Sequence, residues 1–188
     1  MILNIFCGAR KSAPPNAAES KEPPVNILTV NLLLSTFVFW IAARLYLLPR
    51  LHACEPRDVL LPILLLHALR HLGLMFLAPG AVYPGIPAQF TIPAAFGDLL
   101  AAVLAVIAIP AVAMRARSAK ALVWLFNLAG SLDLAAAIAL ATVHDAAPFM
   151  GPAYWIPAFW VPALLVTHYV TFRVLLTPWT ADARSPQA

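Results

Sequence analysis

Five long apolar runs constrain the fold of this 188-residue chain more than any other feature. They cover roughly residues 26–48, 57–78, 92–114, 120–143 and 154–176. A helix that crosses the hydrocarbon core of a bilayer needs about 20 mostly apolar residues, so each run is long enough to cross once. We therefore predict an all-α fold, namely a polytopic membrane bundle of five transmembrane helices.

Composition excludes the other broad classes of protein. The chain is 62% hydrophobic and 11% charged, whereas an average soluble domain is about 45–50% apolar and about 25% charged. These fractions exclude a soluble globular domain and a disordered chain. Only two cysteines, Cys7 and Cys54, are present and they form no CxxC motif, which excludes a disulfide-framed secreted module. No stripe of interleaved basic and aromatic residues occurs, so we expect no nucleic-acid partner.

The same pattern divides the chain into three segments. Residues 1–25 are rich in proline, alanine and charge, which predicts a flexible N-terminal tail. Residues 26–178 form the predicted transmembrane domain, and residues 179–188 form a short C-terminal tail. We expect the lipid bilayer to be the main partner. A small-molecule ligand, further copies of the chain or a larger membrane complex are additional candidates.

The distribution of basic residues predicts an orientation. Lysine and arginine concentrate in or beside the loops after the first and third runs, at Arg44, Arg50, Arg57, Arg115, Arg117 and Lys120. The loops at residues 79–91 and 144–153 contain neither. Because such residues favour the cytoplasmic side, we predict N-terminus out and C-terminus in, in a bacterial inner membrane. The tail residues Arg10, Lys11 and Lys21 run against this orientation, since they would have to cross.

Polar side chains interrupt the apolar runs and predict a ligand-binding site. The set consists of Asn31, His67, Arg70, His71, Asp98, Asn127 and Asp133. A charge at the bilayer centre costs about 2.5–3.5 kcal/mol on insertion scales, so such residues normally face the protein interior and pair. The motif His67-x-x-Arg70-His71 fits within about 100° of one helix face, and Asp98 and Asp133 are the natural partners of its Arg70 and His71. Counted along the predicted helices, four runs carry polar groups in the outer half of the membrane, which favours one shared site.

Two functions fit such a site without a cofactor. In the one we favour, the site lines a cavity that binds or transports a small solute or protons. Arg70 would then supply a fixed charge, and His71 would exchange protons near neutral pH. In the other, the charges form a structural ion-pair network in an assembly subunit of a larger membrane complex.

A third function is a membrane-embedded enzyme or redox protein. A zinc site would use four ligands, His67, His71, Asp98 and Asp133. Arg70 would place a positive charge beside that cation. A haem would use His67 and His168, which lie at similar predicted depths and could bind one iron from two sides. The chain contains no GxSxG, HExxH, Walker or GxGxxG motif, so the sequence assigns no catalytic residue.

Overall fold

The computed structural model describes residues 26–51 and 53–179 of the chain. Over these residues the regular structure is helical, with no strand. The frame consists of α1 (Ile27–Ala42), α2 (Pro56–Ala68), α3 (Ala88–Ala113), α4 (Ala119–Val143) and α5 (Val161–Leu175). The predicted tails at residues 1–25 and 180–188, together with Cys7, lie outside the described residues.

Short 3₁₀ and π-helical segments extend three of these helices. A π turn, η1 (Ala43–Leu47), and a 3₁₀ turn, η2 (Leu48–Arg50), continue α1, and a 3₁₀ helix, η3 (Leu69–Leu77), continues α2. Three short segments lead into α5, namely η4 (Ala147–Phe149), η5 (Gly151–Tyr154) and η6 (Ile156–Trp160). With these extensions the described chain has five helices of 22 to 26 residues that are long and apolar enough to cross a membrane. The predicted all-helical bundle with five such helices is thus confirmed.

The third helix begins earlier than the sequence predicts. We expected it to start near residue 92, but α3 starts at Ala88 directly after Pro87. The amides of Phe90 and Thr91 both donate to the Pro87 carbonyl at 3.1 Å, which closes the first turn. Pro93 therefore lies inside the helix, one turn further in.

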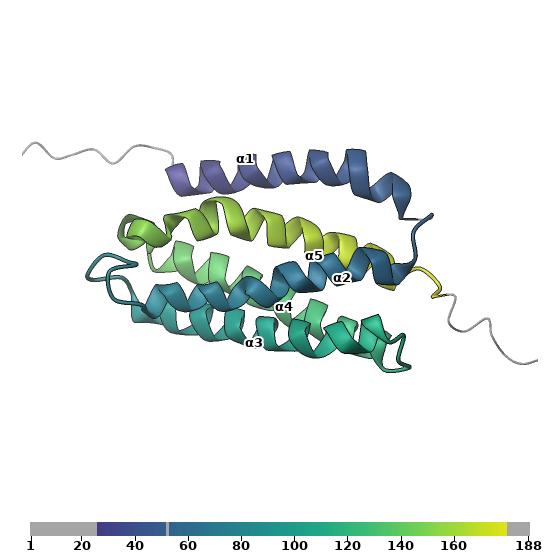
Figure 1. The fold of residues 1–188 in the computed structure, drawn as a ribbon. Helices are drawn as coiled ribbons and strands as arrows, with labels where there is room; N and C mark the ends of the chain where they lie inside the picture. The colour runs from purple at the N-terminus through teal and green to yellow at the C-terminus, as the bar shows by residue number, and fades with distance from the viewer. Residues whose placement is uncertain (1–25, 52, 180–188) are drawn as a thin grey trace, which may run out of the picture.

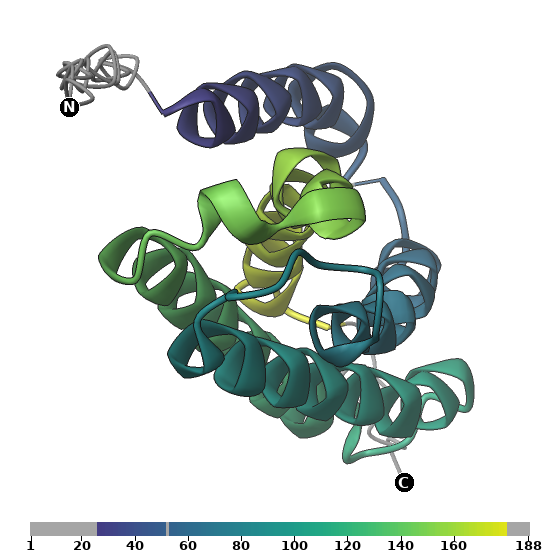
Figure 2. The same cartoon turned by 90° about the vertical axis from the view of Figure 1, so that its left-hand side faces the viewer.

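The five helices lie side by side and alternate in direction (Figure 1). Seen along the bundle, α3 and α4 form one side, α5 lies in the middle, and α1 lies on the far side (Figure 2). In the most apolar window of the first span only 6% of residues are buried, against 50% in the last span. Helix α1 packs on α5 and η6 through edge contacts between Phe39 and Phe159 and between Trp40 and Tyr169. It is therefore a peripheral helix, and the other four enclose the core.

The 3₁₀ segment η3 determines which side chains of the second helix point inward. Its buried residues are Arg70, Gly73 and Phe76, which follow one another at intervals of three. A 3₁₀ helix has 3.0 residues per turn, so residues at this interval share one face. Runs of this kind longer than three or four residues are uncommon, whereas η3 has nine residues. The helix thus tightens at the position where it carries its buried charge.

Apolar clusters enclose the middle of the bundle from both ends. Phe76, Phe90 and Leu134 belong to one cluster, and Leu60 and Phe126 belong to the other. By position along the helices, the buried charged residues Arg70 and Asp98 lie between the two clusters. Charges placed there are held in an apolar environment, where electrostatic interactions are strong.

Candidate functional site

Arg70 is the centre of the candidate site. It is the largest of the fully buried side chains in the described part of the chain, with an exposed fraction of 0%. A guanidinium carries five N–H donors, and buried donors need acceptors. Four acceptors from three helices meet it, namely Asp98 on α3, Gly130 and Asp133 on α4, and His168 on α5. One side chain therefore connects η3 to the three helices around it.

Two carboxylates pair with this guanidinium. The Nε of Arg70 donates to Oδ1 of Asp98 at 2.7 Å, and its Nη2 donates to Oδ2 of Asp133 at 2.5 Å. Asp98 follows the start of α3 by ten residues and Asp133 precedes the end of α4 by ten, so both lie about 15 Å from the same end of the bundle. The exposed fraction of the side chain is 12% for Asp98 and 17% for Asp133. The predicted contact of Arg70 with both aspartates is thus present, and the acids remain partly accessible.

His168 completes the site as a neutral imidazole. Its Nε2 lies 3.3 Å from Nη1 of Arg70, and its Nδ1 lies 2.7 Å from Oδ1 of Asn127. Arginine can only donate, so Nε2 must accept, and the amide oxygen of Asn127 requires Nδ1 to donate. The amide nitrogen of Asn127 faces the backbone oxygen of His168 at 3.4 Å, which agrees with this assignment. The histidine therefore adds no positive charge to the site.

His67 lies behind His168 and is also fully buried. Its Nε2 is 2.9 Å from the hydroxyl of Thr167. That hydroxyl directs its one proton to the carbonyls of Ala163 and Leu164, at 2.9 and 3.0 Å, so Nε2 of His67 donates. The Nδ1 of His67 has no hydrogen-bond partner among the described residues. His67 therefore contributes a buried acceptor close to the charged groups.

Three glycines make space for the charged side chains. A Cβ atom on Gly73 would lie 2.6 Å from the Cβ of Asp98, and one on Gly97 would overlap the carboxylate of Asp133. A Cβ on Gly130 would lie 2.8 Å from the arginine Nη1 and 2.7 Å from the Cε1 of the histidine. Real Cβ atoms essentially never lie this close to atoms of a neighbouring residue. Each glycine thus lies opposite a member of the site on a neighbouring helix and lets the backbones approach closely.

The charges of the site do not balance when both acids are ionised. Arg70 contributes one positive charge, Asp98 and Asp133 contribute two negative charges, and the neutral His168 contributes none. Uncompensated charge is costly in an apolar interior. One bound proton or one small cation would make the site neutral. The arrangement is therefore suited chemically to binding a positive species.

Comparison with known proteins assigns the chain to a family. Residues 27–176 match the family described as "Domain of unknown function (DUF8737)". The chain belongs to this family. The DUF8737 match includes all five α-helices and every member of the buried site. No curated protein and no solved structure matches the chain.

In this DUF8737 protein two predicted ligand-binding residues lie apart from Arg70. His71 is exposed, and its Nδ1 is 3.0 Å from the carbonyl oxygen of Ala68 in the preceding turn. A 3₁₀ helix advances about 120° per residue, so η3 turns His71 away from the face of Arg70. Asn31 donates to the hydroxyl of Tyr154 at 3.0 Å and so joins α1 to η5 instead. The structure thus corrects the predicted places of both residues.

The predicted zinc ligands are not brought together. In the described residues no group of three or more histidine, cysteine, aspartate or glutamate side chains could hold a metal ion. His71 is turned outward, and His67 points to Thr167 while both aspartates point to Arg70. The four residues therefore face three different directions, and the zinc interpretation does not fit this geometry.

The predicted haem site is also not formed. The ring centroids of His67 and His168 are only 4.3 Å apart, and Phe126 contacts both rings. Two axial imidazoles bind from opposite faces of a haem and are separated by the macrocycle. Here the rings touch directly, and the Nε2 atoms face Thr167 and Arg70. No porphyrin fits between them.

Sequence reasoning missed the role of His168 as the partner of Arg70 and the role of the glycines. The sequence does contain one signal for the glycines, because Gly97 directly precedes Asp98 and small residues recur along the third and fourth helices. Such spacing predicts close helix packing but does not show which side chain fills the space. No sequence signal connects His168 to Arg70, because their contact depends on how α5 packs against η3.

Proposed function

We propose that this protein is an integral membrane protein whose buried site of Arg70, Asp98, Asp133 and His168 binds and releases a proton. Proton exchange at this site would serve the transport of protons or of a small solute across the membrane. The observation that carries the proposal is the pairing of one guanidinium with two carboxylates inside the bundle. Intramembrane ionisable residues with named partners are typical of such functional sites.

The bound species in this proposal is positive and small. Four acceptors already occupy Arg70, so the guanidinium has little left to offer an anionic solute. The two aspartates together have one negative charge that Arg70 does not balance. A proton on one carboxyl oxygen balances it without displacing either ion pair. Asp133, with the more exposed of the two side chains, is the group that would exchange this proton with water.

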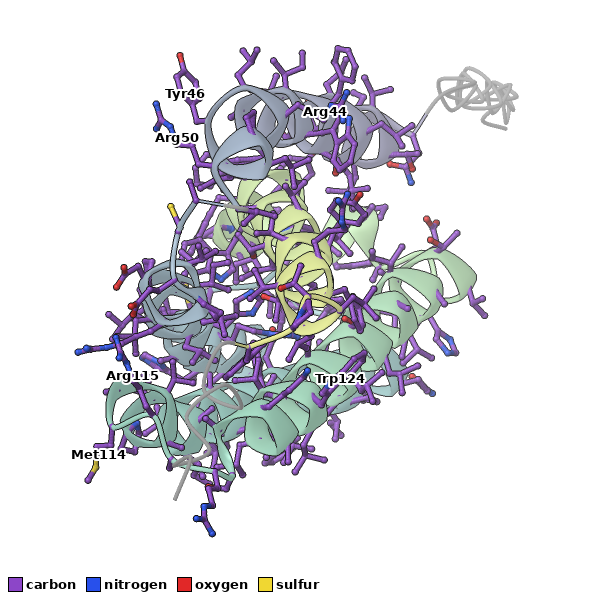
Figure 3. All side chains as sticks on the ribbon, turned by 90° about the vertical axis from the view of Figure 1, so that its right-hand side faces the viewer. Arg44, Tyr46, Arg50, Met114, Arg115 and Trp124 are labelled. Atoms are coloured by element: carbon purple, nitrogen blue, oxygen red, sulfur yellow. The ribbon has the colours of Figure 1, made fainter. Side chains whose placement is uncertain are left out.

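We further propose that the end of the bundle carrying basic loops faces the cytoplasm, as in a bacterial inner membrane. Arg44, Arg50 and Arg115 lie at one end of the molecule, which Figure 3 shows from that side. An ion pair between Arg115 and Glu55 joins the two basic loops. The bias of arginine and lysine toward cytoplasmic loops supports this orientation. The aspartates then lie in the outer half of the bundle.

Reconstitution into liposomes tests the proton-binding site. We expect the wild-type protein to conduct protons down an imposed pH gradient, and Asp133→Asn to lower this flux to that of empty liposomes. Asparagine keeps an oxygen to accept from Arg70 but cannot bind the proton. Asp145→Asn is the matched control, because Asp145 is an exposed loop residue outside the site. Its flux should stay within about twofold of wild type, since surface substitutions have small effects.

Infrared difference spectroscopy gives a second readout that does not depend on transport. The carbonyl band of a protonated carboxyl group should be present in the wild type and absent in Asp133→Asn. If the wild type shows neither this band nor proton flux, the proposal is wrong. The charges then form a structural network, as expected for an assembly subunit.

A further inference from the structure

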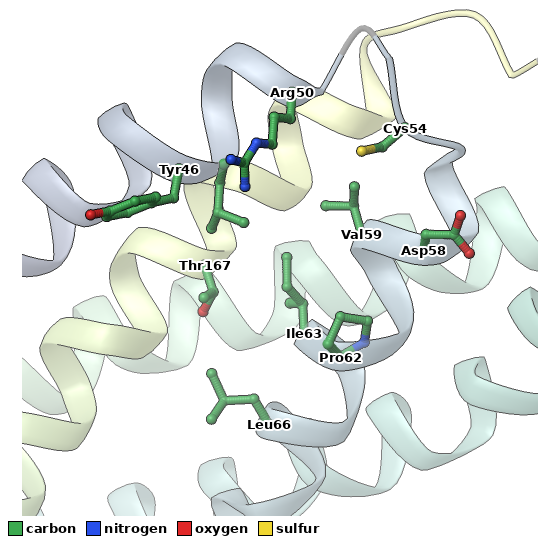
Figure 4. A pocket seen from close by; sticks show the side chains of 10 residues that line it. Tyr46, Arg50, Cys54, Asp58, Val59, Pro62, Ile63, Leu66 and Thr167 are labelled. Atoms are coloured by element: carbon green, nitrogen blue, oxygen red, sulfur yellow. The ribbon is translucent and has the colours of Figure 1, made fainter.

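A groove separate from the buried site opens between the first two helices. Its volume is about 460 Å³, within the range of about 300–1,000 Å³ typical of ligand sites. The segments η1 and η2 form one wall, and the first turns of α2 form the other (Figure 4). Leu47, Val59, Pro62, Ile63 and Leu66 make most of its lining apolar.

One basic side chain extends into this groove. Arg50 lies at the end of η2, and Figure 4 shows its guanidinium pointing into the cavity. No ion pair of Arg50 exists with any described residue, whereas Arg115 at the same end pairs with Glu55. Asp58 also lines the groove, but its carboxylate lies on the α2 side and forms no ion pair with Arg50 (Figure 4). Among the described residues no ion pair balances the charge of Arg50, which lies at the rim of an apolar surface.

The groove runs along the helices rather than across them. Its upper rim contains Arg50 and Cys54, in the connection between the two helices. Its deep end contains Leu66, ten residues into α2 and so about 15 Å below the start of that helix, together with Thr167 of α5. In a bundle that spans a bilayer, the rim lies at the headgroup region and the deep end lies among the acyl chains.

We propose that this groove binds one anionic phospholipid. Arg50 would pair with the phosphate, and one acyl chain would lie along Val59, Ile63 and Leu66. Basic pockets between transmembrane helices on the cytoplasmic side bind anionic lipid headgroups, and guanidinium groups match phosphate geometry. A soluble phosphate compound would leave the apolar lining uncovered. This inference rests on the membrane insertion proposed above but not on proton binding.

A lipid bound in this groove would also contact Thr167, which lies next to the buried site. Thr167 lines the deep end of the groove and accepts from Nε2 of His67. An acyl chain at this position would cover the hydroxyl and exclude water from that side of the site. Thr167 and His67 thus connect the groove to the ring of His168 in the charged site.

Lipid retention measured by native mass spectrometry tests the proposal. Delipidated protein in detergent is mixed with phosphatidylglycerol, with phosphatidylcholine or with glycerol 3-phosphate. We expect stoichiometric retention of phosphatidylglycerol, and about fivefold weaker retention by Arg50→Gln, the effect of one basic residue on an anionic lipid. Val59→Phe, which fills the groove, should weaken retention without removing a charge.

Two matched controls make the assignment specific. Arg117→Gln removes an exposed arginine from the other basic loop and should retain the lipid as the wild type does. Asp58→Asn removes the acidic side chain from the lining and should retain phosphatidylglycerol at least as well as the wild type does. A loss of binding in Asp58→Asn would instead show a headgroup with a positive group, which would overturn the anionic assignment.

The native thiol of Cys54 provides a second readout at the rim. In a Cys7→Ser background, phosphatidylglycerol should slow maleimide labelling of Cys54, and Arg50→Gln should remove this protection. Equal protection by phosphatidylcholine, or by glycerol 3-phosphate alone, would overturn the proposal. If the protein is not recovered from membranes at all, membrane insertion is wrong. If it is recovered there but Arg50→Gln binds like the wild type, only the lipid site is wrong.

Discussion

At the scale of single residues, the stability of the site depends on which charge is removed. Arg70→Ala would leave two carboxylates facing each other inside the bundle. Removing one partner of a buried ion pair typically costs about 3–5 kcal/mol, so we expect a loss of that size in unfolding free energy in detergent. Asp98→Asn keeps an acceptor for Arg70 and makes the site neutral, so its cost should stay below about 1.5 kcal/mol.

The double variant distinguishes a network from independent contacts. Arg70→Ala combined with Asp98→Ala leaves one carboxylate instead of two and should be more stable than Arg70→Ala alone. The measurement is a double-mutant cycle of thermal or denaturant unfolding. If the two single effects add within about 0.5 kcal/mol, Arg70 and Asp98 are not energetic partners, and the charge argument for the site fails.

Some contacts of the site could be predicted from the sequence, and others could not. The cost of burying charge predicted that Arg70 would meet Asp98 and Asp133, because few other partners exist in the apolar runs. It did not predict His168, whose place depends on how α5 packs. Histidine spacing also could not distinguish a metal ligand from a hydrogen-bonded side chain. The direction of each ring follows from tertiary contacts with Asn127 and Thr167.

At the scale of elements, the apolar runs predicted the five helices but not their local geometry. The observed starts differ from the predicted ones by one to four residues, with the largest difference at the third helix. Periodicity of 3.6 placed His71 beside Arg70, whereas η3 has a period of 3.0 and turns His71 outward. The tighter helix brings Gly73 against Asp98 of α3. This contact depends on two helices, so one helix's sequence cannot reveal it.

The close approach of η3 and α3 can be tested at Gly73. Gly73→Ala places a methyl group where the side chain of Asp98 lies, and overpacking of this kind costs about 1–3 kcal/mol. We expect this loss in thermal unfolding in detergent, and a smaller loss when Asp98→Ala removes the carboxylate. Ala135→Val, which adds carbon to an exposed position of α4, is the control and should be nearly neutral. Equal costs of Gly73→Ala in both backgrounds would contradict the contact.

At the scale of the whole molecule, each crossing moves the chain to the other side of the membrane, so successive loops lie on alternating sides. Cys54 lies in the first connection, among the basic residues, and Asp145 lies in a loop without lysine or arginine at the other end of the bundle. In intact cells carrying Cys7→Ser, a membrane-impermeant thiol reagent should not label Cys54 until the membrane is permeabilised. The variant Asp145→Cys with Cys54→Ser should be labelled directly, because the basic end faces the cytoplasm.

The reverse pattern would invert the orientation and move the site to the inner half of the membrane. Labelling of both positions from outside would contradict the crossing of α2, α3 and α4, and with it the five-span arrangement on which the proton and lipid proposals depend.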